Sequence, residues 1–311
     1  MFELLAIDLV DIDGPEALRR QSLMSPFVWR DDTGALLVLL RVVPDPLRPD
    51  DITGRIWLGR CGGEGLRFHM DPAPLLEPGP GPRDIGGCED PTVVLEGQRC
   101  LVYYTGLNEN GDGELLYADG PDIHHLTKRG VALASSKTQR NTKEAAVAQN
   151  ADGRWRLLYE YSRDCKSRIG LAYARAPEGP WDEQDDPFVA RADKWDSWHL
   201  STGPLLMSKP DKLVMFYNGA DRAATWGTGW VVFDRACSKV IARSDEPLIG
   251  PPEERYEGRD IFFACSAIEC DGEIWIYGSK NDHRVVRARV RRSGKRPAAD
   301  RRGTKPAAAE A

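Results

Sequence analysis

Residues 145–161 read AAVAQNADGRWRLLYEY, and this stretch carries the pattern that decides the fold. Two apolar segments, AAVA at 145–148 and WRLLYEY at 155–161, flank the turn signal NADG. Short apolar runs bounded by Asn, Asp and Gly are typical of buried β-strands joined by a tight turn. The stretch therefore predicts an antiparallel pair of strands.

The same pattern recurs along the chain. The second run of each pair lies at residues 36–43, 100–105, 155–161, 213–218 and 274–278. Aligned on Arg41, Thr105, Glu160, Asn218 and Gly278, the runs are 64, 55, 58 and 60 residues apart. Another apolar segment begins fifteen residues before each aligned position, and a third strand pattern follows each run. A unit of three or four strands that repeats in step is typical of a propeller. We therefore predict an all-β, five-bladed β-propeller, with coincidental spacing in another all-β fold as the alternative.

The composition is that of a soluble chain with a substantial core, since 41% of the 311 residues are hydrophobic. No apolar stretch reaches the roughly 18–20 residues that span a bilayer. The N-terminal stretch carries acids where a secretory signal carries bases. The seven cysteines have neither paired nor zinc-like spacing. We expect a cytoplasmic protein with reduced thiols, no bound metal and no membrane partner.

The net charge of −6 is unevenly distributed. Residues 291–311 hold seven Lys or Arg against Asp300 and Glu310, which leaves −11 on the remainder. An acidic body argues against nucleic acid as a partner. We expect residues 1–290 to form a single catalytic propeller domain and residues 291–311 to be a basic, disordered tail.

The predicted topology gathers charged residues at one end of the propeller. The innermost strand of each blade begins, and the next strand ends, at the same mouth of the central channel. The charged residues expected at this mouth are Arg41, Glu89, Asp90, Lys143, Glu144, Glu160 and Asp282. Several carboxylates and cations around a narrow cleft suit acid–base chemistry on a polar, neutral substrate, and an oligosaccharide is the leading candidate.

Five segments at the predicted mouth also resemble the motifs of one enzyme family. GGCEDPTVV at 86–94 resembles a GCEDPR motif, and RNTKEAAV at 140–147 resembles a basic stretch before the third inner strand. WDSWHLSTGPLL at 195–206 resembles W…KIGAGPPP, MFYNGA at 215–220 resembles IYHG, and IWIYGSKND at 274–282 resembles YYGAAD. The family is glycoside hydrolase family 130, the β-mannoside phosphorylases and β-mannosidases, whose members are five-bladed propellers.

The resemblance implies roles for individual residues. Asp90 matches the family's catalytic acid, which protonates the glycosidic oxygen through a sugar hydroxyl, and Asp282 matches a sugar-binding aspartate. Arg41, Glu89 and Lys143 are expected to bind substrate beside them. An acid must be protonated near neutral pH, and repulsion from Glu89 is expected to favour this. The simpler alternatives are a strand-capping role for Asp90 and an exposed turn at Asp282.

The family's phosphate ligands are only partly retained. The residues at matching positions are Arg41, Arg140, Asn141, His199 and Asn218. His199 replaces a lysine, Asn218 replaces a histidine, and Thr92 stands where the motif has arginine. A phosphate dianion requires several charged donors, so these changes weaken the site. Surface or inter-blade ion pairs are the alternative role of the arginines.

We therefore expect cleavage of β-mannosidic linkages in oligosaccharides by inverting hydrolysis, with Glu160 or Glu144 as the base that activates water. The alternative is phosphorolysis to mannose 1-phosphate. No cofactor is expected in either case, and inorganic phosphate would be a co-substrate of the phosphorylase.

Two further classes remain open. One is a non-catalytic sugar-binding propeller in which Trp195, Trp198 and Trp226 stack on pyranose rings, although propeller tryptophans usually pack between blades. The other is an arabinanase- or fructosidase-like enzyme, which needs an Asp near the first inner strand. The segment SPFVW, residues 25–29, has none.

Overall fold

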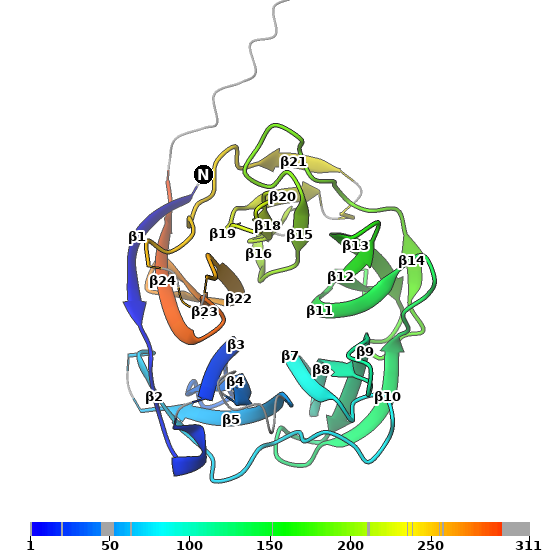
Figure 1. Ribbon diagram of the computed structural model, residues 1–311, viewed down its shortest axis with the longest axis vertical. Coiled ribbons are helices and arrows are strands. Elements are labelled where there is room, and N and C mark those ends of the chain that lie inside the picture. Colours follow the sequence, from blue (N-terminus) through cyan, green and yellow to red (C-terminus); the bar gives the residue numbers. More distant parts are fainter. Residues whose placement is uncertain are drawn as a thin grey trace, which may run out of the picture.

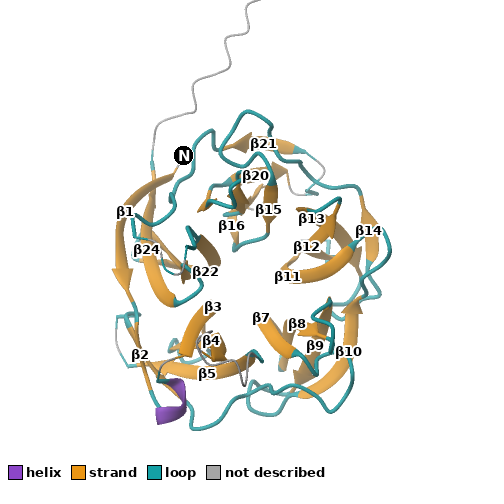
Figure 2. Cartoon of the chain, in the orientation of Figure 1, coloured by secondary structure: helices purple, strands orange, loops and turns teal. Residues whose placement is uncertain are grey.

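The computed structural model is an all-β protein, which confirms the predicted class. It describes residues 2–19, 21–44, 53–62, 64–150, 152–209, 212–234, 236–237, 239–254, 256 and 258–293. Within these ranges the helical structure is a single 3-10 turn, Glu16–Leu18. Figure 2 shows the strands joined by loops, with this turn at the periphery.

The strands form sheets arranged in a ring, and the strands β3, β7, β11 and β22 lie nearest its centre (Figure 1). The first sheet, in the order β2-β6-β5-β4-β3, contains β2 (Asp11–Asp13), β3 (Gln21–Arg30), β4 (Leu36–Pro44), β5 (Arg55–Cys61) and β6 (Arg67–Met70). The second, in the order β10-β9-β8-β7, contains β7 (Gly87–Glu96), β8 (Arg99–Leu107), β9 (Gly113–Gly120) and β10 (Thr127–Leu133). The third contains β11 (Arg140–Gln149), β12 (Trp155–Arg163), β13 (Lys166–Ala174) and β14 (Asp182–Gln184), in chain order.

The next part of the ring is divided into two sheets. One contains β15 (His199–Ser201), β18 (Asn218–Ala220) and β19 (Trp226–Thr228). The other contains β16 (Leu205–Lys209), β17 (Lys212–Met215), β20 (Val231–Asp234) and β21 (Val240–Arg243). The inner strand is interrupted at Pro204, which has no backbone N–H to donate to a ladder.

The last sheet joins the two ends of the described chain. Its order is β1-β24-β23-β22, with β1 (Phe2–Leu9), β22 (Phe262–Cys270), β23 (Glu273–Lys280) and β24 (Arg284–Arg292). The apolar N-terminal stretch did not indicate this pairing, because its partner strand β24 lies almost the whole chain away. The exposed face of β1 is largely apolar, with Leu5, Ile7 and Leu9. The strand β24 also ends two residues beyond the expected domain boundary, since Arg291 donates a hydrogen bond to Glu3 across the β1–β24 pair at 3.0 Å. Residues 294–311 of the expected tail lie outside the described residues.

The strand register agrees with the repeat. In each unit the aligned residue of the second strand pairs with the start of the inner strand. The pairs are Met24 with Arg41, Glu89 with Thr105, Lys143 with Glu160, Ser201 with Asn218, and Ala264 with Gly278. The repeat thus brings corresponding positions of different sheets to the same end of the ring.

The inner strands β3, β7 and β11 are bulged directly after the paired residue. The residues in the bulges are Ser25, Asp90 and Glu144, with φ of +50°, +48° and +51°. Non-glycine residues rarely adopt this left-handed conformation, and it persists where the surrounding structure enforces it. A bulge re-aims the side chain of its extra residue, so these three side chains depart from the ordinary alternation of a strand.

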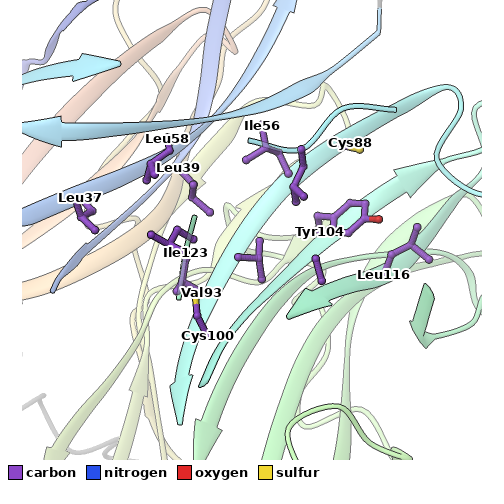
Figure 3. Packing of buried hydrophobic residues seen from close by; sticks show 13 residues of the cluster. Leu37, Leu39, Ile56, Leu58, Cys88, Val93, Cys100, Tyr104, Leu116 and Ile123 are labelled. Carbon is purple, nitrogen blue, oxygen red and sulfur yellow. The ribbon is translucent and has the colours of Figure 1, made fainter. Parts of the chain in front are cut away.

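Apolar contacts between neighbouring sheets hold the ring together. Figure 3 shows one such cluster, in which Leu39 and Ile56 of the first sheet pack against Val93, Tyr104 and neighbours of the second. Further clusters join the second sheet to the third, and the last sheet to the first. Because each sheet packs on two neighbours, the inner strand ends are fixed relative to one another.

Candidate active site

The inner ends of the sheets enclose a polar cavity of about 190 Å³, which we call the acid cavity. Its lining residues are Met24, Ser25, Arg41, Asp90, Lys143, Glu144, Glu160, Ser167, Trp226, Ile261, Phe263, Ser279 and Asp282. Six of the seven charged residues expected at the mouth line this one cavity. The seventh, Glu89, accepts a hydrogen bond from Arg41 at 2.5 Å.

Asp90 is buried and surrounded by donors. The Ser25 hydroxyl donates to Asp90 Oδ1 at 2.7 Å, and Arg41 Nη1 donates to the same oxygen at 3.3 Å. Ser25 is itself held in place, because its backbone N–H donates to Ser279 Oγ at 2.9 Å. The other carboxyl oxygen, Oδ2, has a longer contact of 3.4 Å with the Thr105 hydroxyl. The donors are therefore concentrated on Oδ1, and Oδ2 is the freer oxygen.

The electrostatics of Asp90 differ from the sequence-based expectation. Burial alone would raise the pKa of Asp90. The charges of Arg41 and Lys143 and the hydrogen bond from Ser25 have a larger opposite effect, so the pKa of Asp90 is lowered overall. The expected increase through repulsion by Glu89 is wrong in sign, because the nearby cations outweigh it. Glu89 has the raised pKa instead, chiefly because of burial.

Glu144 occupies the corresponding bulge in β11 and has the opposite electrostatics. Ser201 Oγ donates to Glu144 Oε2 at 2.6 Å, and Lys143 Nζ lies 3.7 Å from Oε1. Burial, and then repulsion by Glu160, hold the pKa of Glu144 well above its usual range. Glu144 is thus a carboxyl that tends to retain a proton.

Glu160 and Asp282 are the other two carboxyl residues that line the acid cavity. Lys143 Nζ lies 3.4 Å from Glu160 Oε1, and the Glu160 charge is the chief cause of the raised pKa of Lys143. Asp282 follows β23 in a turn with φ of +49°, and burial raises its pKa. The cavity therefore holds the Lys143–Glu160 ion pair next to Glu144 and Asp282, whose pKa values burial raises.

The residues expected to bind phosphate do not meet in this cavity. Arg140 is exposed and pairs with Asp112 at 3.1 Å. Asn141 accepts a hydrogen bond from the Gly113 N–H at 2.9 Å. Both residues line a separate cavity of about 500 Å³ that shares no lining residue with the acid cavity.

Asn218 and His199 are also engaged elsewhere. Asn218 is fully buried, and its amide group makes four hydrogen bonds within the protein: it donates to the carbonyls of Thr202 and Ala264, and it accepts from Thr228 Oγ1 and the Ala264 N–H. His199 Nδ1 accepts from the Ser167 N–H at 3.0 Å, and burial lowers the pKa of its imidazole. His199 is therefore a neutral ring rather than a cationic phosphate ligand.

The three tryptophans considered for sugar stacking lie in different places, one in the core and two near the acid cavity. Trp195 stacks on Tyr217 at 5.5 Å within a hydrophobic cluster, as expected for packing. Trp226 lines the acid cavity and stacks on His199 at 5.6 Å. Trp198 lies at the outer edge of the site, with its ring 6.3 Å from His199. Thr92 is not part of the acid-cavity lining, and its hydroxyl donates to the Ala145 carbonyl at 2.6 Å, which ties β7 to β11.

Three serines of the site were not singled out as functional by the sequence analysis. Ser25 and Ser279 hold Asp90 in place, and Ser167 contacts His199 and lines the cavity. The repeat had placed residue 25 at the mouth, which was the available signal. The hydrogen-bond partner of a serine hydroxyl depends on the geometry of the bulge, and the pattern of apolar residues does not predict that geometry.

The described residues contain no cluster of three or more His, Cys, Asp or Glu side chains with the arrangement of a metal site. They also contain no helix with the length and hydropathy needed to cross a bilayer.

A ring of β-sheets with a small cavity that combines several carboxyls, two cations and a tryptophan defines the class: a carbohydrate-active enzyme, either a glycosidase or a glycoside phosphorylase. A sequence profile described as β-1,4-mannooligosaccharide phosphorylase matches residues 50–291, and the chain belongs to this family, glycoside hydrolase family 130. The family acts on β-mannosides. Its phosphorylases use inorganic phosphate as co-substrate and need no cofactor.

Solved structures share the fold at low sequence identity. The β-1,2-mannobiose phosphorylase of Listeria innocua is 17% identical, with 91% of this chain and 90% of that chain covered and a TM-score of 0.73. A structure reported with family 130 glycoside hydrolases that target β-1,2-mannosidic linkages in Candida mannan is 18% identical, with 95% and 96% covered and a TM-score of 0.74. The mannose phosphorylase MPT-4 of Leishmania mexicana, in complex with phosphate, is 14% identical, with 92% and 88% covered and a TM-score of 0.68. A comparison with curated proteins finds no match.

Proposed function

We propose that this protein cleaves β-mannosidic linkages in oligosaccharides by inverting hydrolysis, within a five-bladed β-propeller. In this proposal the two sheets that contain β15–β21 are the inner and outer parts of one blade. The body of the chain, up to the end of β24, is then a single catalytic domain.

One observation favours hydrolysis over phosphorolysis: most of the residues expected to bind phosphate do not lie together at the acid cavity. Arg140 and Asn141 line another cavity, Asn218 is saturated with protein hydrogen bonds, and His199 is neutral. Only Arg41 of the five lines the acid cavity, and it is paired with Glu89 and Asp90. A phosphate dianion would there lack most of its charged donors.

Asp90 is the proposed general acid, as the family match implies. Ser25 and Arg41 both donate to Oδ1, so a proton on the carboxyl is more stable on Oδ2. Oδ2 is then the atom that delivers the proton toward the glycosidic oxygen, through a hydroxyl of the bound sugar. Ser25 acts as a positioning residue that determines which oxygen is protonated.

Asp90 and Glu144 are proposed to hold one proton between them. They line both the acid cavity and a smaller cavity of about 30 Å³ beneath it, which is large enough for a water molecule. The free protein favours that proton on Glu144, since the pKa directions of the two groups are opposite. The acid and its neighbour then titrate as a coupled pair.

Glu160 is the proposed general base. Lys143 Nζ lies within ion-pair distance of both candidates, 3.4 Å from Glu160 and 3.7 Å from Glu144. A base must be ionised, and burial together with the Glu160 charge raises the pKa of Glu144, which makes Glu144 the poorer base. Glu160 would remove a proton from water as the water attacks the anomeric carbon. The leaving oxygen receives its proton from Asp90, so the proton balance closes and the anomeric configuration inverts.

Phosphorolysis to mannose 1-phosphate is the second candidate. Its support is the family profile, which is described by a phosphorylase activity, and the presence of Arg41 and Lys143 in the cavity. In that case phosphate takes the place of the attacking water and no general base is needed.

The test is product analysis with β-1,2- and β-1,4-linked mannobiose, with and without inorganic phosphate. We expect mannose at the same rate in both conditions, with the α-anomer appearing first by NMR. Formation of mannose 1-phosphate only when phosphate is present would overturn hydrolysis. The Asp90→Asn variant, assayed in parallel, separates this enzyme from a trace contaminant.

A further inference from the structure

A second cavity of about 140 Å³ adjoins the acid cavity, and Ser167 lines both. We call it the rim cavity. Its lining residues are Lys166, Ser167, Arg168, Asp186, Phe188, Val189, Ala190, Trp198 and Leu200. The stacked rings of Trp226 and His199, followed by Trp198, connect the two cavities along one side. A substrate that enters the acid cavity can therefore extend into the rim cavity along an aromatic wall.

Two cations lie over the ring of Trp198: Lys166, which lines the rim cavity, and Arg222, which contacts the ring from outside the lining. Lys166 Nζ is 4.1 Å and the Arg222 guanidinium carbon 4.4 Å from the ring centroid. The two charges are thus within about 10 Å of each other, the Debye length at 0.1 M salt, and repel one another. Neither is ion-paired with a carboxylate in the part of the chain that the structure describes, whereas the neighbouring Arg168 contacts Asp164 at 3.4 Å.

The acid cavity has the opposite charge balance. Its four carboxyl groups, those of Asp90, Glu144, Glu160 and Asp282, outnumber the cations Arg41 and Lys143 even with one proton shared by Asp90 and Glu144. In the rim cavity the cations Lys166 and Arg168 outnumber the single carboxyl group, that of Asp186. An anionic group is therefore disfavoured in the acid cavity and favoured at Lys166 and Arg222. Such a charge difference over one continuous site orients a substrate that is neutral at one end and anionic at the other.

We propose that the rim cavity binds the leaving part of the substrate and selects one that carries an anionic group, a carboxylate or a phosphate, held by Lys166 and Arg222 beside the Trp198 ring. This inference rests on the proposed function, because it assigns the neutral mannosyl unit to the acid cavity. Arg222 offers a planar fork of donors to such a group, and Lys166 offers a point charge.

The experiment compares two disaccharides that differ in one group: β-mannosyl-1,4-glucose and β-mannosyl-1,4-glucuronic acid. A third substrate, β-mannosyl-1,4-glucose 6-phosphate, distinguishes phosphate from carboxylate recognition. We expect kcat/KM for an acidic substrate to exceed that for the neutral one by about fivefold or more at low salt, as partly exposed ion pairs allow. The preference should decrease as salt is added.

The double variant Lys166→Gln/Arg222→Gln should bring the acidic-to-neutral ratio close to one. The matched control is Arg154→Gln, because Arg154 also lies over an aromatic ring, Tyr173 at 5.6 Å, but lines neither cavity. This control should keep the wild-type ratio. Equal kcat/KM for all three substrates, or a preference that survives in the double variant, would overturn the inference and leave the proposed function standing.

A direct binding measurement separates the two proposals. If no β-mannoside is cleaved, the proposed function fails, and titration calorimetry with glucuronate and glucose still tests the rim cavity. We expect glucuronate to bind the wild type more tightly than glucose, and the double variant to lose this difference. Equal affinity of the wild type for glucuronate and glucose, together with no binding of inorganic phosphate that depends on Lys166 and Arg222, would also overturn the inference.

Discussion

Asp90 in β7 and Glu144 in β11 occupy equivalent bulges of neighbouring strands, yet their pKa values move in opposite directions. Both carboxyls are buried, so burial does not explain the difference. Asp90 accepts hydrogen bonds from Arg41 and Ser25, and the charge of Lys143 also lowers its pKa. Glu144 is repelled by Glu160, which pairs with the same lysine. The comparison teaches that a repeated backbone supplies the position of a functional group, and that its neighbours in adjacent sheets supply its chemistry.

The largest expected effect comes from removing the acid. Asp90→Asn keeps the shape of the side chain but cannot deliver a proton, so kcat on a β-mannobiose should decrease by roughly 10³-fold, within the range for general acids. The measurement is the initial rate of mannose release. An unchanged thermal unfolding midpoint would show that the loss is chemical, and a rate within a few-fold of wild type would remove Asp90 from the mechanism.

Replacing the proposed base should have an effect of about 10²-fold or more on hydrolysis. In Glu160→Ala no carboxylate activates water, but a small anion such as azide needs no activation and could use the space. We expect azide to restore turnover and to yield α-mannosyl azide, detected by mass spectrometry and NMR. Full activity of this variant without azide would contradict the assignment.

The shared proton predicts a shift in pH dependence. In the wild type, kcat/KM should decrease as pH rises through the higher of the two pKa values of the pair, which Glu144 holds above the usual carboxyl range. In Glu144→Gln, Asp90 must hold the proton alone, and its pKa is lowered. The decrease of kcat/KM with rising pH should therefore occur at lower pH in this variant. A decrease at the same pH as in the wild type would show that the Glu144 proton does not take part in acid catalysis.

The smallest expected effect is that of Ser25. Removal of its hydroxyl takes a 2.7 Å hydrogen bond from the Asp90 carboxylate, so the pKa of Asp90 should rise. Because Ser25 then no longer directs the proton to Oδ2, kcat should nevertheless decrease by about tenfold. Ser25→Gly and Ser25→Ala both lose the hydroxyl, but only glycine adopts the +50° φ without strain. Equal kcat in the two variants, with lower stability for alanine, separates positioning of the acid from backbone strain.

The position of the site could be predicted from the sequence because it follows from the repeat. The alignment on Arg41, Thr105 and Glu160 identified the residues that pair with the inner strand starts, and these strand ends enclose the cavity. The all-β class followed from the same arithmetic. These features depend on the spacing of apolar residues, which the sequence records directly.

The chemistry of the site could not be predicted in the same way. The pKa direction of Asp90 depends on how close Arg41 and Lys143 lie, and both come from other sheets. Arg140 is only three residues from Lys143, but the bulged register of β11 leaves it outside the cavity. The strand β1 was missed because its partner, β24, is almost the whole chain away.

That last pairing has a consequence for how the protein is made. Phe2 lies opposite Arg292 and Leu9 opposite Val286, so the sheet that contains β22 is completed only when the first and last strands meet. A ribosome releases the first strand long before the last is synthesised, and contacts of such sequence separation form slowly. Because Phe263, Ser279 and Asp282 of that sheet line the acid cavity, the cavity would be completed only at the end of synthesis. An incomplete chain would then lack the complete site.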